Sequence, residues 1–581
     1  MTEYNCNSVP RPEYPRPQLV RENWINLNGC WEFEIDHGNS GKARKLYEAE
    51  KLQGKILVPF CPESKLSGVE YKDFMAAVWY RREFEVPENW TSNRILLHFG
   101  AVDYDAEVWV NGVSAGKHRG GYTSFTFDIT NLVKTGKNIV TVCAEDDLRS
   151  GLQPRGKQSS EFYSHGCDYT RTTGIWQTVW LECVPKEYIV SFKCYPDPAN
   201  SYLHIEALLN ESMCGYSFKA EALYNNVNVG SDSATVTGNT VRLSLKLSEV
   251  HLWDVGQPEL YDLYITLANN DKDIDRIKSY FGLRIVSFDD NAILINGKPV
   301  FQRLVLDQGF YPDGIYTAPT DEDLKKDIQL SLDMGFNGAR LHQKVFEPRY
   351  LFWADKMGYL VWGEQGNWGL DITTSKGLER FLPEWIEAVE RDFNHPAIVG
   401  WCPFNETWDL NGTRQNDEVL RITYNVTKAI DSTRPVIDTS GNFHVVTDIF
   451  DIHDYEQNPE VFASYFEPMK NGGEVYVTFK NRQRYEGQPY FVSEYGGIWW
   501  NPGDEAGWGY GQRPASEEEF IERYKGLTEA LLNNPKICAL CYTQLYDVEQ
   551  EVNGLYTYGR KAKFNPEIIK AINSQKAAIE K

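Results

Sequence analysis

The feature that most constrains the fold is the alternation of short apolar runs with helical patterns over residues 286–581. The runs have strand length and continuous apolar character, as strands buried on both faces do; they are Val300–Leu306, Gly338–Leu341, Tyr359–Trp362, Ile398–Phe404, Val436–Thr439, Asp448–Ile452, Tyr490–Val492 and Ile537–Tyr542. Helical periodicity separates several of them, at Asp321–Met334, Pro348–Met357, Gly377–Phe393, Asn416–Ile430 and Ser516–Asn533. Eight such strands with intervening helices predict a catalytic (β/α)8 TIM barrel. The stretch 455–489 has weak periodicity and predicts a loop insertion at the mouth.

Two of these predicted strands stop at a glutamate. Ile398–Phe404 runs into Asn405 and Glu406, and Tyr490–Val492 runs into Ser493 and Glu494. Most of the 82 acidic residues are expected to be solvated surface, but a carboxylate at the end of a buried run needs a partner or a chemical role. The carboxyl ends of barrel strands face the active site. Two carboxylates converging there predict glycoside hydrolysis.

The first half of the chain shows strand patterns only. Residues 1–185 contain short alternating runs followed by turn pairs such as Asn111-Gly112, which predicts a jelly-roll β-sandwich. Residues 186–285 hold a second series of alternating runs at regular spacing, which predicts an immunoglobulin-like β-sandwich. The expected order is therefore a sugar-binding-like sandwich, a second sandwich, and the barrel over residues 286–581.

Composition excludes several function classes. The net charge of −23 argues against nucleic acid and against anionic membrane surfaces. The start of the chain has no basic and apolar leader, and no apolar run reaches membrane-spanning length. Cysteines show no metal-type spacing; Cys538 and Cys541 lie in an apolar run, where core packing is favoured over redox chemistry. We expect a cytoplasmic soluble protein that needs neither a cofactor nor a metal.

Motifs along nearly the whole chain resemble glycoside hydrolase family 2, the group of β-galactosidases, β-glucuronidases and β-mannosidases. The segments that carry the resemblance, in order, are Arg11-Pro12, Asn28–Phe33, Val108–Gly112, Gly174–Gln177, Leu252-Trp253, Pro258–Tyr261, Phe281–Arg284, Asn405-Glu406 and Ser493–Gly496. The resemblance implies hydrolysis of a β-glycoside with retention of configuration. Glu406 would be the general acid and then base, and Glu494 the nucleophile. Asn405 would hold the 2-hydroxyl of the sugar.

The resemblance implies further contacts around these glutamates. Arg340 would support the nucleophile electrostatically, and Tyr455 would donate a hydrogen bond to it. Tyr542 would stack on the sugar ring, and Asp168 would reach a sugar hydroxyl from the first sandwich. Asp307 stands where many members carry a different sequence, Asn-Arg-His-Glu, and could bind hydroxyls.

The sequence constrains the identity of the sugar less than the reaction type. A uronate needs a cation to pair its carboxylate, and β-glucuronidases of the family carry an Asn-x-Lys pair after the last barrel strand. The corresponding segment, Asp547–Tyr556, has several acids and no lysine, so it favours a neutral sugar: β-D-galactose first, then α-L-arabinopyranose. A β-uronidase stays open, because a cation could come from another direction, namely from Arg340, Lys344, Arg560 or Lys561. A non-catalytic carbohydrate-binding protein is the alternative of another class. The expected partner is an oligosaccharide or glycoside substrate, and the sequence is also compatible with a homo-oligomer.

Overall fold

The computed structural model describes residues 8–503 and 506–581. Its first part is a β-sandwich of a six-stranded antiparallel sheet, in the order β3-β2-β4-β10-β7-β8, and a four-stranded sheet, β1-β12-β5-β9. The facing sides enclose one apolar core. The strands are β1 Trp24–Asn26, β2 Gly29–Ile35, β3 Gly54–Val58, β4 Ala77–Val86, β5 Arg94–Phe99, β6 Val102–Asp103, β7 Asp105–Val110, β8 Val113–Arg119, β9 Phe125–Asp128, β10 Gly136–Glu145, β11 Gly174–Ile175 and β12 Val179–Val184.

A second sandwich follows, with its own core. A three-stranded sheet, β13-β14-β17, faces a four-stranded sheet, β16-β15-β20-β21. Strict alternation of buried and exposed residues in β17 shows why this sequence forms a half-buried strand. The strands, with the short ones that lead to the barrel, are β13 Ile189–Asp197, β14 Tyr202–Leu209, β15 Ser217–Tyr224, β16 Val227–Thr235, β17 Thr240–Lys246, β18 Trp253–Asp254, β19 Gln257–Pro258, β20 Tyr261–Asn269, β21 Lys272–Phe281, β22 Val286–Phe288, β23 Ile293–Ile295 and β24 Lys298–Pro299.

The third part is a curled parallel sheet in the order β28-β27-β26-β25-β33-β32-β31. The remaining strand, β30, pairs in parallel with β29, which continues β28, and its Ser440 hydroxyl donates to Asp451 in β31 at 2.6 Å. This closes a TIM barrel, and every predicted strand is present with shifted ends. They are β25 Gln302–Asp307, β26 Gly338–Leu341, β27 Leu360–Glu364, β28 Ile398–Cys402, β29 Phe404–Asn405, β30 Thr439–Ser440, β31 Phe450–Asp454, β32 Tyr490–Gly496 and β33 Ile537–Thr543.

Helices surround the barrel at the five predicted places and at two others. The predicted ones are α1 Asp321–Asp333, α2 Pro348–Met357, α3 Ser375–Asp392, α4 Asp417–Ile430 and α6 Glu517–Leu532. The others are α5 Pro459–Lys470 and α7 Pro566–Asn573. Helix α5 occupies a third of the stretch 455–489, for which weak periodicity predicted a loop insertion and no helix. Its buried residues are aromatic or sulfur-containing, with Pro468 inside the helix, a composition that hides the helical pattern.

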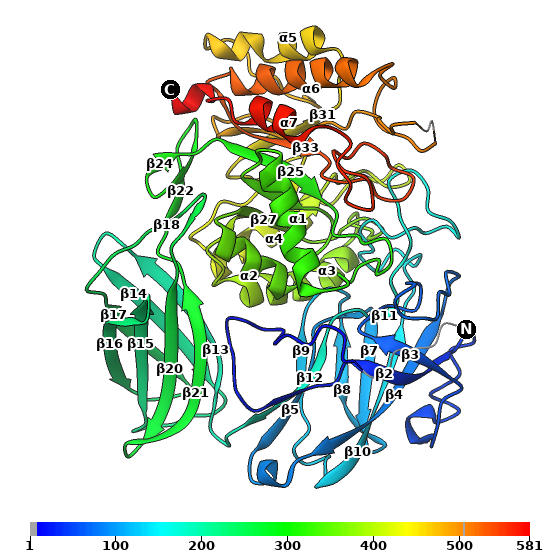
Figure 1. The fold of residues 1–581 in the computed structure, drawn as a ribbon, viewed down its shortest axis with the longest axis vertical. Coiled ribbons are helices and arrows are strands. Elements are labelled where there is room, and N and C mark those ends of the chain that lie inside the picture. Colours follow the sequence, from blue (N-terminus) through cyan, green and yellow to red (C-terminus); the bar gives the residue numbers. More distant parts are fainter. Residues whose placement is uncertain (1–7, 504–505) are drawn as a thin grey trace.

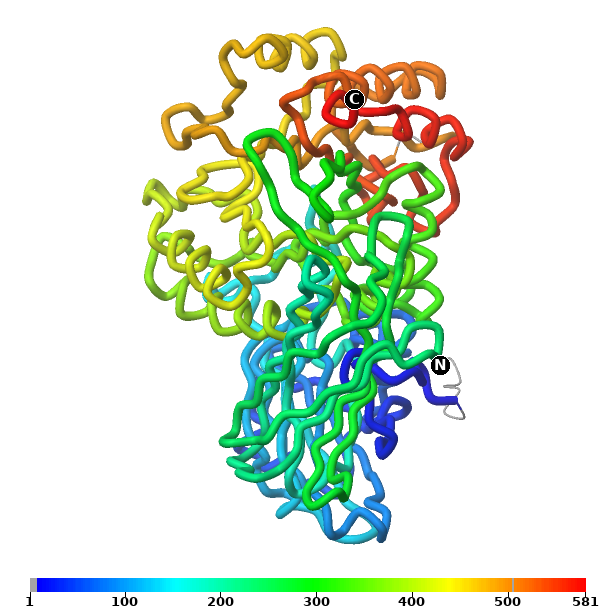
Figure 2. The backbone as a smooth tube through the Cα atoms, turned by 90° about the vertical axis from the view of Figure 1, so that its left-hand side faces the viewer, coloured from blue at the N-terminus to red at the C-terminus, as the bar shows by residue number. Residues whose placement is uncertain are grey.

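Both sandwiches lie on the same side of the barrel. In Figure 1 they stand side by side beneath it, and after a quarter turn they overlap in the lower half while the barrel fills the upper half (Figure 2). A loop of the first sandwich rests on the barrel, since the Trp508 indole and the Gln550 amide donate to the Gly166 carbonyl. Among the helices of the described residues, none is long and apolar enough to span a membrane.

Candidate active site

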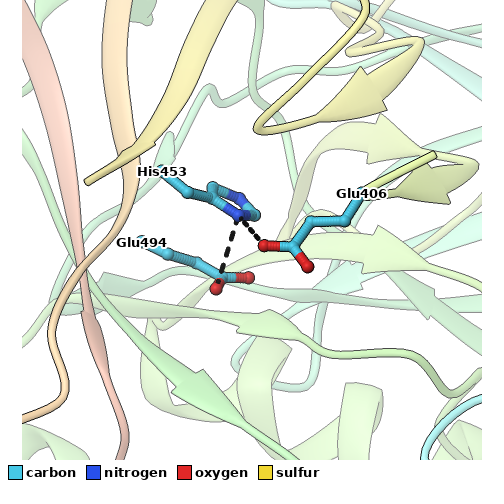
Figure 3. Close-up of side chains that lie close together, drawn as sticks. All are labelled: Glu406, His453 and Glu494. Carbon is cyan, nitrogen blue, oxygen red and sulfur yellow. Dashed lines mark hydrogen bonds and ion pairs between the residues drawn. The ribbon is translucent and has the colours of Figure 1, made fainter. Parts of the chain in front are cut away.

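The two predicted glutamates meet in space. Glu406 follows β29, Glu494 lies within β32, and His453 of β31 stands between them (Figure 3). One carboxylate oxygen of each glutamate and a ring nitrogen of His453 all lie within 4.8 Å of one another. His453 Nδ1 is 2.7 Å from Glu406 Oε1 and 3.5 Å from Glu494 Oε2. Carboxylates this close match the roughly 5 Å spacing of retaining glycosidases, not the roughly 6.5–9.5 Å of inverting ones.

Glu494 is held as a buried carboxylate, with 4% of its surface exposed. Burial alone would raise its pKa, but the charges of His453, His342 and Arg340 outweigh that effect. Together with a hydrogen bond from the Tyr455 hydroxyl they lower the pKa of Glu494 to about 2. Glu406 differs, because 23% of its side chain is exposed. One carboxylate is therefore fixed in its charged form, and the other is open to exchange protons.

Arg340 ties the site together from β26. Its guanidinium lies 3.2 Å from Glu494 Oε1 and 2.8 Å from Glu364 Oε2, and donates to Asn405 Oδ1 at 2.8 Å. The side chain is 1% exposed, so these charge-assisted bonds act in a medium that screens them weakly. The structure thus places Arg340 against Glu494, where the resemblance put it.

The Asn405 side chain has one free hydrogen-bonding group. Its Oδ1 accepts from Arg340, which orients the amide, while the buried Nδ2 has no protein partner among the residues in the described ranges. The backbone N–H of Asn405 donates to Asn367 Oδ1 at 2.8 Å. A buried amide group without a partner is costly unless a ligand satisfies it. Nδ2 is therefore available to a sugar hydroxyl.

The same cluster could hold a divalent cation. Glu406, His453 and Glu494 offer one nitrogen and two oxygens at mutual distances suited to one ion. The Arg340 guanidinium already places a positive charge on Glu494. The expectation that no metal is needed stays a prediction.

Two of the predicted sugar contacts do not fit the structure. Asp307 is 1% exposed, and its carboxylate accepts from Gly309 N–H and from the hydroxyls of Tyr546 and Tyr350, so it has no free face for a sugar. Tyr542 is fully buried, with edge-to-face contacts to Tyr495 at 5.7 Å and Tyr524 at 4.9 Å. Both residues end their strands as predicted, but neighbouring aromatic side chains enclose them.

Asp168 lies on the sandwich loop that covers the barrel. Arg155 forms an ion pair with it at 2.6 Å, and the Arg155 N–H donates to the Trp368 carbonyl of the barrel at 2.8 Å. Its carboxylate is engaged by the protein, and a contact with a sugar hydroxyl remains a prediction.

Sequence reasoning missed Lys157, from the same sandwich loop. Its side chain is buried, with the ammonium 3.9 Å from the centre of the Trp368 ring. Within residues 8–503 and 506–581 no carboxylate lies within 4.0 Å of it. Burial would lower its pKa, yet electrostatic interactions with the Cys167 sulfur and with the carboxylates of Glu551, Glu494 and Glu406 raise it. The only signal in the sequence was a lysine in a loop of another domain, which pattern reading cannot place at the barrel mouth.

Three of the four cations considered from the sequence have other protein partners or are exposed. Lys344 donates to the carbonyls of Gly309 and Tyr316, Arg560 pairs with Asp327 at 3.0 Å, and Lys561 is exposed. Of the four, Arg340 alone is at the site.

Of the three acids in the segment after the last strand, one is paired with a cation and the other two accept hydrogen bonds. Asp547 pairs with Lys563 at 2.6 Å, and Glu549 accepts from the Thr170 N–H. Glu551 accepts from the Tyr169 hydroxyl and the Asn553 amide, and burial raises its pKa. Because Lys563 offsets the charge of Asp547 and burial favours the neutral form of Glu551, the segment repels an anion less than its composition suggested.

Comparison with known proteins agrees with this geometry. The chain matches the models of glycosyl hydrolases family 2 for the sugar binding domain at 25–185, for a second domain at 188–284 and for the TIM barrel domain at 286–525. A relative from Formosa agariphila named as a β-glucuronidase is 29% identical over 351 residues, 58% of this chain and 41% of that protein. A β-galactosidase of Thermoanaerobacter pseudethanolicus is 27% identical over 353 residues, 58% of this chain and 46% of that protein. The chain thus spans less than half the length of these two relatives.

The fold is shared with a solved enzyme. The β-glucuronidase from Ruminococcus gnavus, in complex with D-glucuronic acid, has a TM-score of 0.81 at 18% identity, over 97% of this chain and 99% of that one. Three family models in the family's order, with two glutamates close together in the barrel, favour a glycosidase over a non-catalytic binding protein. The chain belongs to glycoside hydrolase family 2 and is a glycosidase.

Proposed function

We propose that the protein is a retaining β-glycosidase that removes a terminal β-linked uronic acid by double displacement. The observation that carries the mechanism is the close pair of unlike carboxylates: Glu494 buried and ionised, Glu406 partly exposed and within 4.8 Å. A buried carboxylate whose pKa is lowered suits the nucleophile, and a partly exposed carboxyl group beside it suits the acid.

In the first step a Glu494 oxygen attacks the anomeric carbon, and the bond to the aglycone oxygen breaks. Glu406 gives its proton to that oxygen, so the aglycone leaves as an alcohol and the sugar stays as an ester of Glu494. Arg340 and Tyr455 hold the attacking carboxylate in place through contacts with its two oxygens. The free Nδ2 of Asn405 binds the sugar 2-hydroxyl.

In the second step Glu406, now a carboxylate, takes a proton from water while the water oxygen attacks the anomeric carbon. The ester bond breaks, Glu494 returns to its ionised form, and Glu406 is protonated again. His453 lies 2.7 Å from Glu406, and its pKa is raised because the charges of Glu494 and Glu406 outweigh burial. His453 therefore orients the Glu406 carboxyl group through this contact.

A β-uronide, with β-D-glucuronide first, replaces the sequence-based preference for a neutral hexose. Lys157 supports it, as a buried ammonium without a carboxylate partner in the described ranges that lies in the field of both catalytic glutamates. A buried cation of this kind is stabilised when a ligand carboxylate pairs with it. The Formosa agariphila relative and the Ruminococcus gnavus enzyme support the same sugar class by their names.

A neutral β-galactoside is the second candidate. Glu551 is a carboxylate in the field of Lys157, and a carboxylate near the sugar can accept hydrogen bonds from hydroxyls. If the Glu551 carboxylate offsets the charge of the Lys157 ammonium, that ammonium is less available to a substrate carboxylate. The Thermoanaerobacter pseudethanolicus relative is named for this activity.

A panel of 4-nitrophenyl glycosides decides between these sugars. The β-D-glucuronide, β-D-galacturonide, β-D-galactoside and α-L-arabinopyranoside share one leaving group, so kcat/KM compares the sugars alone. We expect the glucuronide to exceed the galactoside by tenfold or more, which corresponds to about 1.4 kcal/mol of transition-state preference. A galactoside that exceeds both uronides would establish the second candidate instead.

A further inference from the structure

An exposed aromatic cluster borders the candidate active site. Trp408, Phe443 and Phe479 contact one another edge to face, with ring centres 5.2–5.8 Å apart. Trp408 is 49% exposed and Phe479 is 45% exposed, whereas Phe443 between them in the sequence is buried. Every other tryptophan is buried or half-buried. We call these three residues the aromatic platform. An apolar patch of this kind on a soluble protein marks a binding surface.

The platform is connected directly to the catalytic residues. Trp408 is two positions after Glu406, whose N–H donates to the Ser440 carbonyl at 2.9 Å. Phe443 follows Ser440 by three positions, and between them Gly441 packs so closely on the His453 ring that an added Cβ would lie 2.5 Å from Nδ1. His453 Nδ1 also contacts Glu406. His453 therefore packs against both Glu406 and the segment that carries Phe443 of the platform.

Backbone strain coincides with this place. Glu406, Phe443 and Phe479 all have positive φ, at 46°, 59° and 52°, a conformation that aromatic and long side chains rarely adopt. Such residues cost roughly 1–3 kcal/mol each and persist where the surrounding structure holds them for function. Arg482 contacts the platform through a cation–π interaction, with its guanidinium 4.0 Å from the centre of the Phe443 ring. The same side chain donates to Asp409 at 2.7 Å, which holds it in this position.

We propose that the aromatic platform is the aglycone site, and that it selects flat apolar aglycones such as fused-ring alcohols. This inference rests on the proposed function, since Glu406 protonates the oxygen that joins sugar and aglycone. A second sugar would need accessible hydrogen-bonding groups, but both oxygens of Asp409 already accept from Gln415 and Arg482. The Nε and Nη2 atoms of Arg482 have no partner in the described residues, yet they are buried and so are not open to a ligand on the exposed rings. The exposed aromatic faces therefore suit an apolar ring system.

Binding, not turnover, gives the test. In a Glu494→Gln background, calorimetry measures the Kd of the methyl and the 2-naphthyl β-glycoside, for both glucuronic acid and galactose. The affinity ratio of naphthyl to methyl isolates the aglycone contribution. We expect Trp408→Ala and Phe479→Ala each to reduce this ratio about fivefold, the scale of one lost aromatic contact. Trp408→Tyr should restore most of it.

Phe288→Ala is the matched control, because Phe288 is an equally exposed phenylalanine on β22, in another part of the chain. It should leave the ratio unchanged. A ratio that persists in Trp408→Ala and Phe479→Ala overturns the platform. Glycosides that bind with the expected ratio but are not hydrolysed by the wild type would instead overturn the proposed function and leave the platform standing. Failure of every glycoside to bind would refute both.

Discussion

Replacing Lys157 with methionine tests the uronide hypothesis most sharply. Methionine keeps the length and apolar contacts of the lysine stem against Trp368 and removes only the charge. If the ammonium pairs with the substrate carboxylate, its loss leaves a buried, unpaired anion in the transition state. The cost of breaking a buried pair is about 3 kcal/mol, or about 150-fold in kcat/KM.

The assay compares two substrates in each variant at one pH. Loss of Lys157 also removes a positive charge near Glu406 and Glu494, but that change affects every sugar alike. The ratio of kcat/KM for the β-glucuronide to that for the β-galactoside is therefore the relevant quantity. It should fall about 100-fold or more in Lys157→Met and stay constant in Lys561→Met, where the lysine is exposed. Lys157→Arg should retain part of the preference.

An equal loss on both substrates would refute this reasoning. It would show that Lys157 acts through the general field of the site or through the sandwich loop, and not through a substrate carboxylate. A ratio that falls in Lys561→Met would instead identify Lys561 as the cation that pairs with the substrate carboxylate.

The remaining predictions concern proton transfer, metal and stability. Glu406→Ala should slow glycosides with poor leaving groups far more than activated aryl glycosides, because only the former need a proton; equal losses would contradict the acid role. Activity should survive chelation, whereas complete loss restored by one metal would place an ion at Glu406, His453 and Glu494. The pKa of His444 is raised to about 10, because bonds to Asp438 and Asp451 outweigh burial. Its stabilising contribution is full below about pH 6.5 and is lost as pH rises through about 10. The Tm difference between wild type and His444→Gln should thus shrink between pH 6 and about 10, and a constant difference would refute the charge on His444.

The barrel strands and the two glutamates were predictable because both signals are local. A buried parallel strand is a continuous apolar run; Glu406 follows such a run directly, and Glu494 interrupts one two residues before its strand ends. Arg340 and Tyr455 reached Glu494 as the resemblance implied. The helix at Pro459–Lys470 was missed because its proline and aromatic residues mask helical periodicity.

The sugar-binding contacts were less predictable because they depend on contacts between distant segments. Tyr542 and Asp307 lie at the carboxyl ends of their strands, yet buried side chains from helices, a loop and a neighbouring strand enclose them. The acids of Asp547–Tyr556 suggested repulsion of an anion, but Lys563 pairs with one of them, and Thr170 and Tyr169 donate hydrogen bonds to two others from distant segments. Lys157 lies in a different domain from the catalytic glutamates, so no spacing along the chain could have brought it to the site.

The anomer released first tests the central claim most directly. Proton NMR can follow hydrolysis of the fastest β-glycoside of the panel from the first turnover, before the free sugar mutarotates. Double displacement at Glu494 predicts that the β-anomer appears first and the α-anomer grows in later. Appearance of the α-anomer first would mean a single displacement by water, and would contradict the role proposed for Glu494.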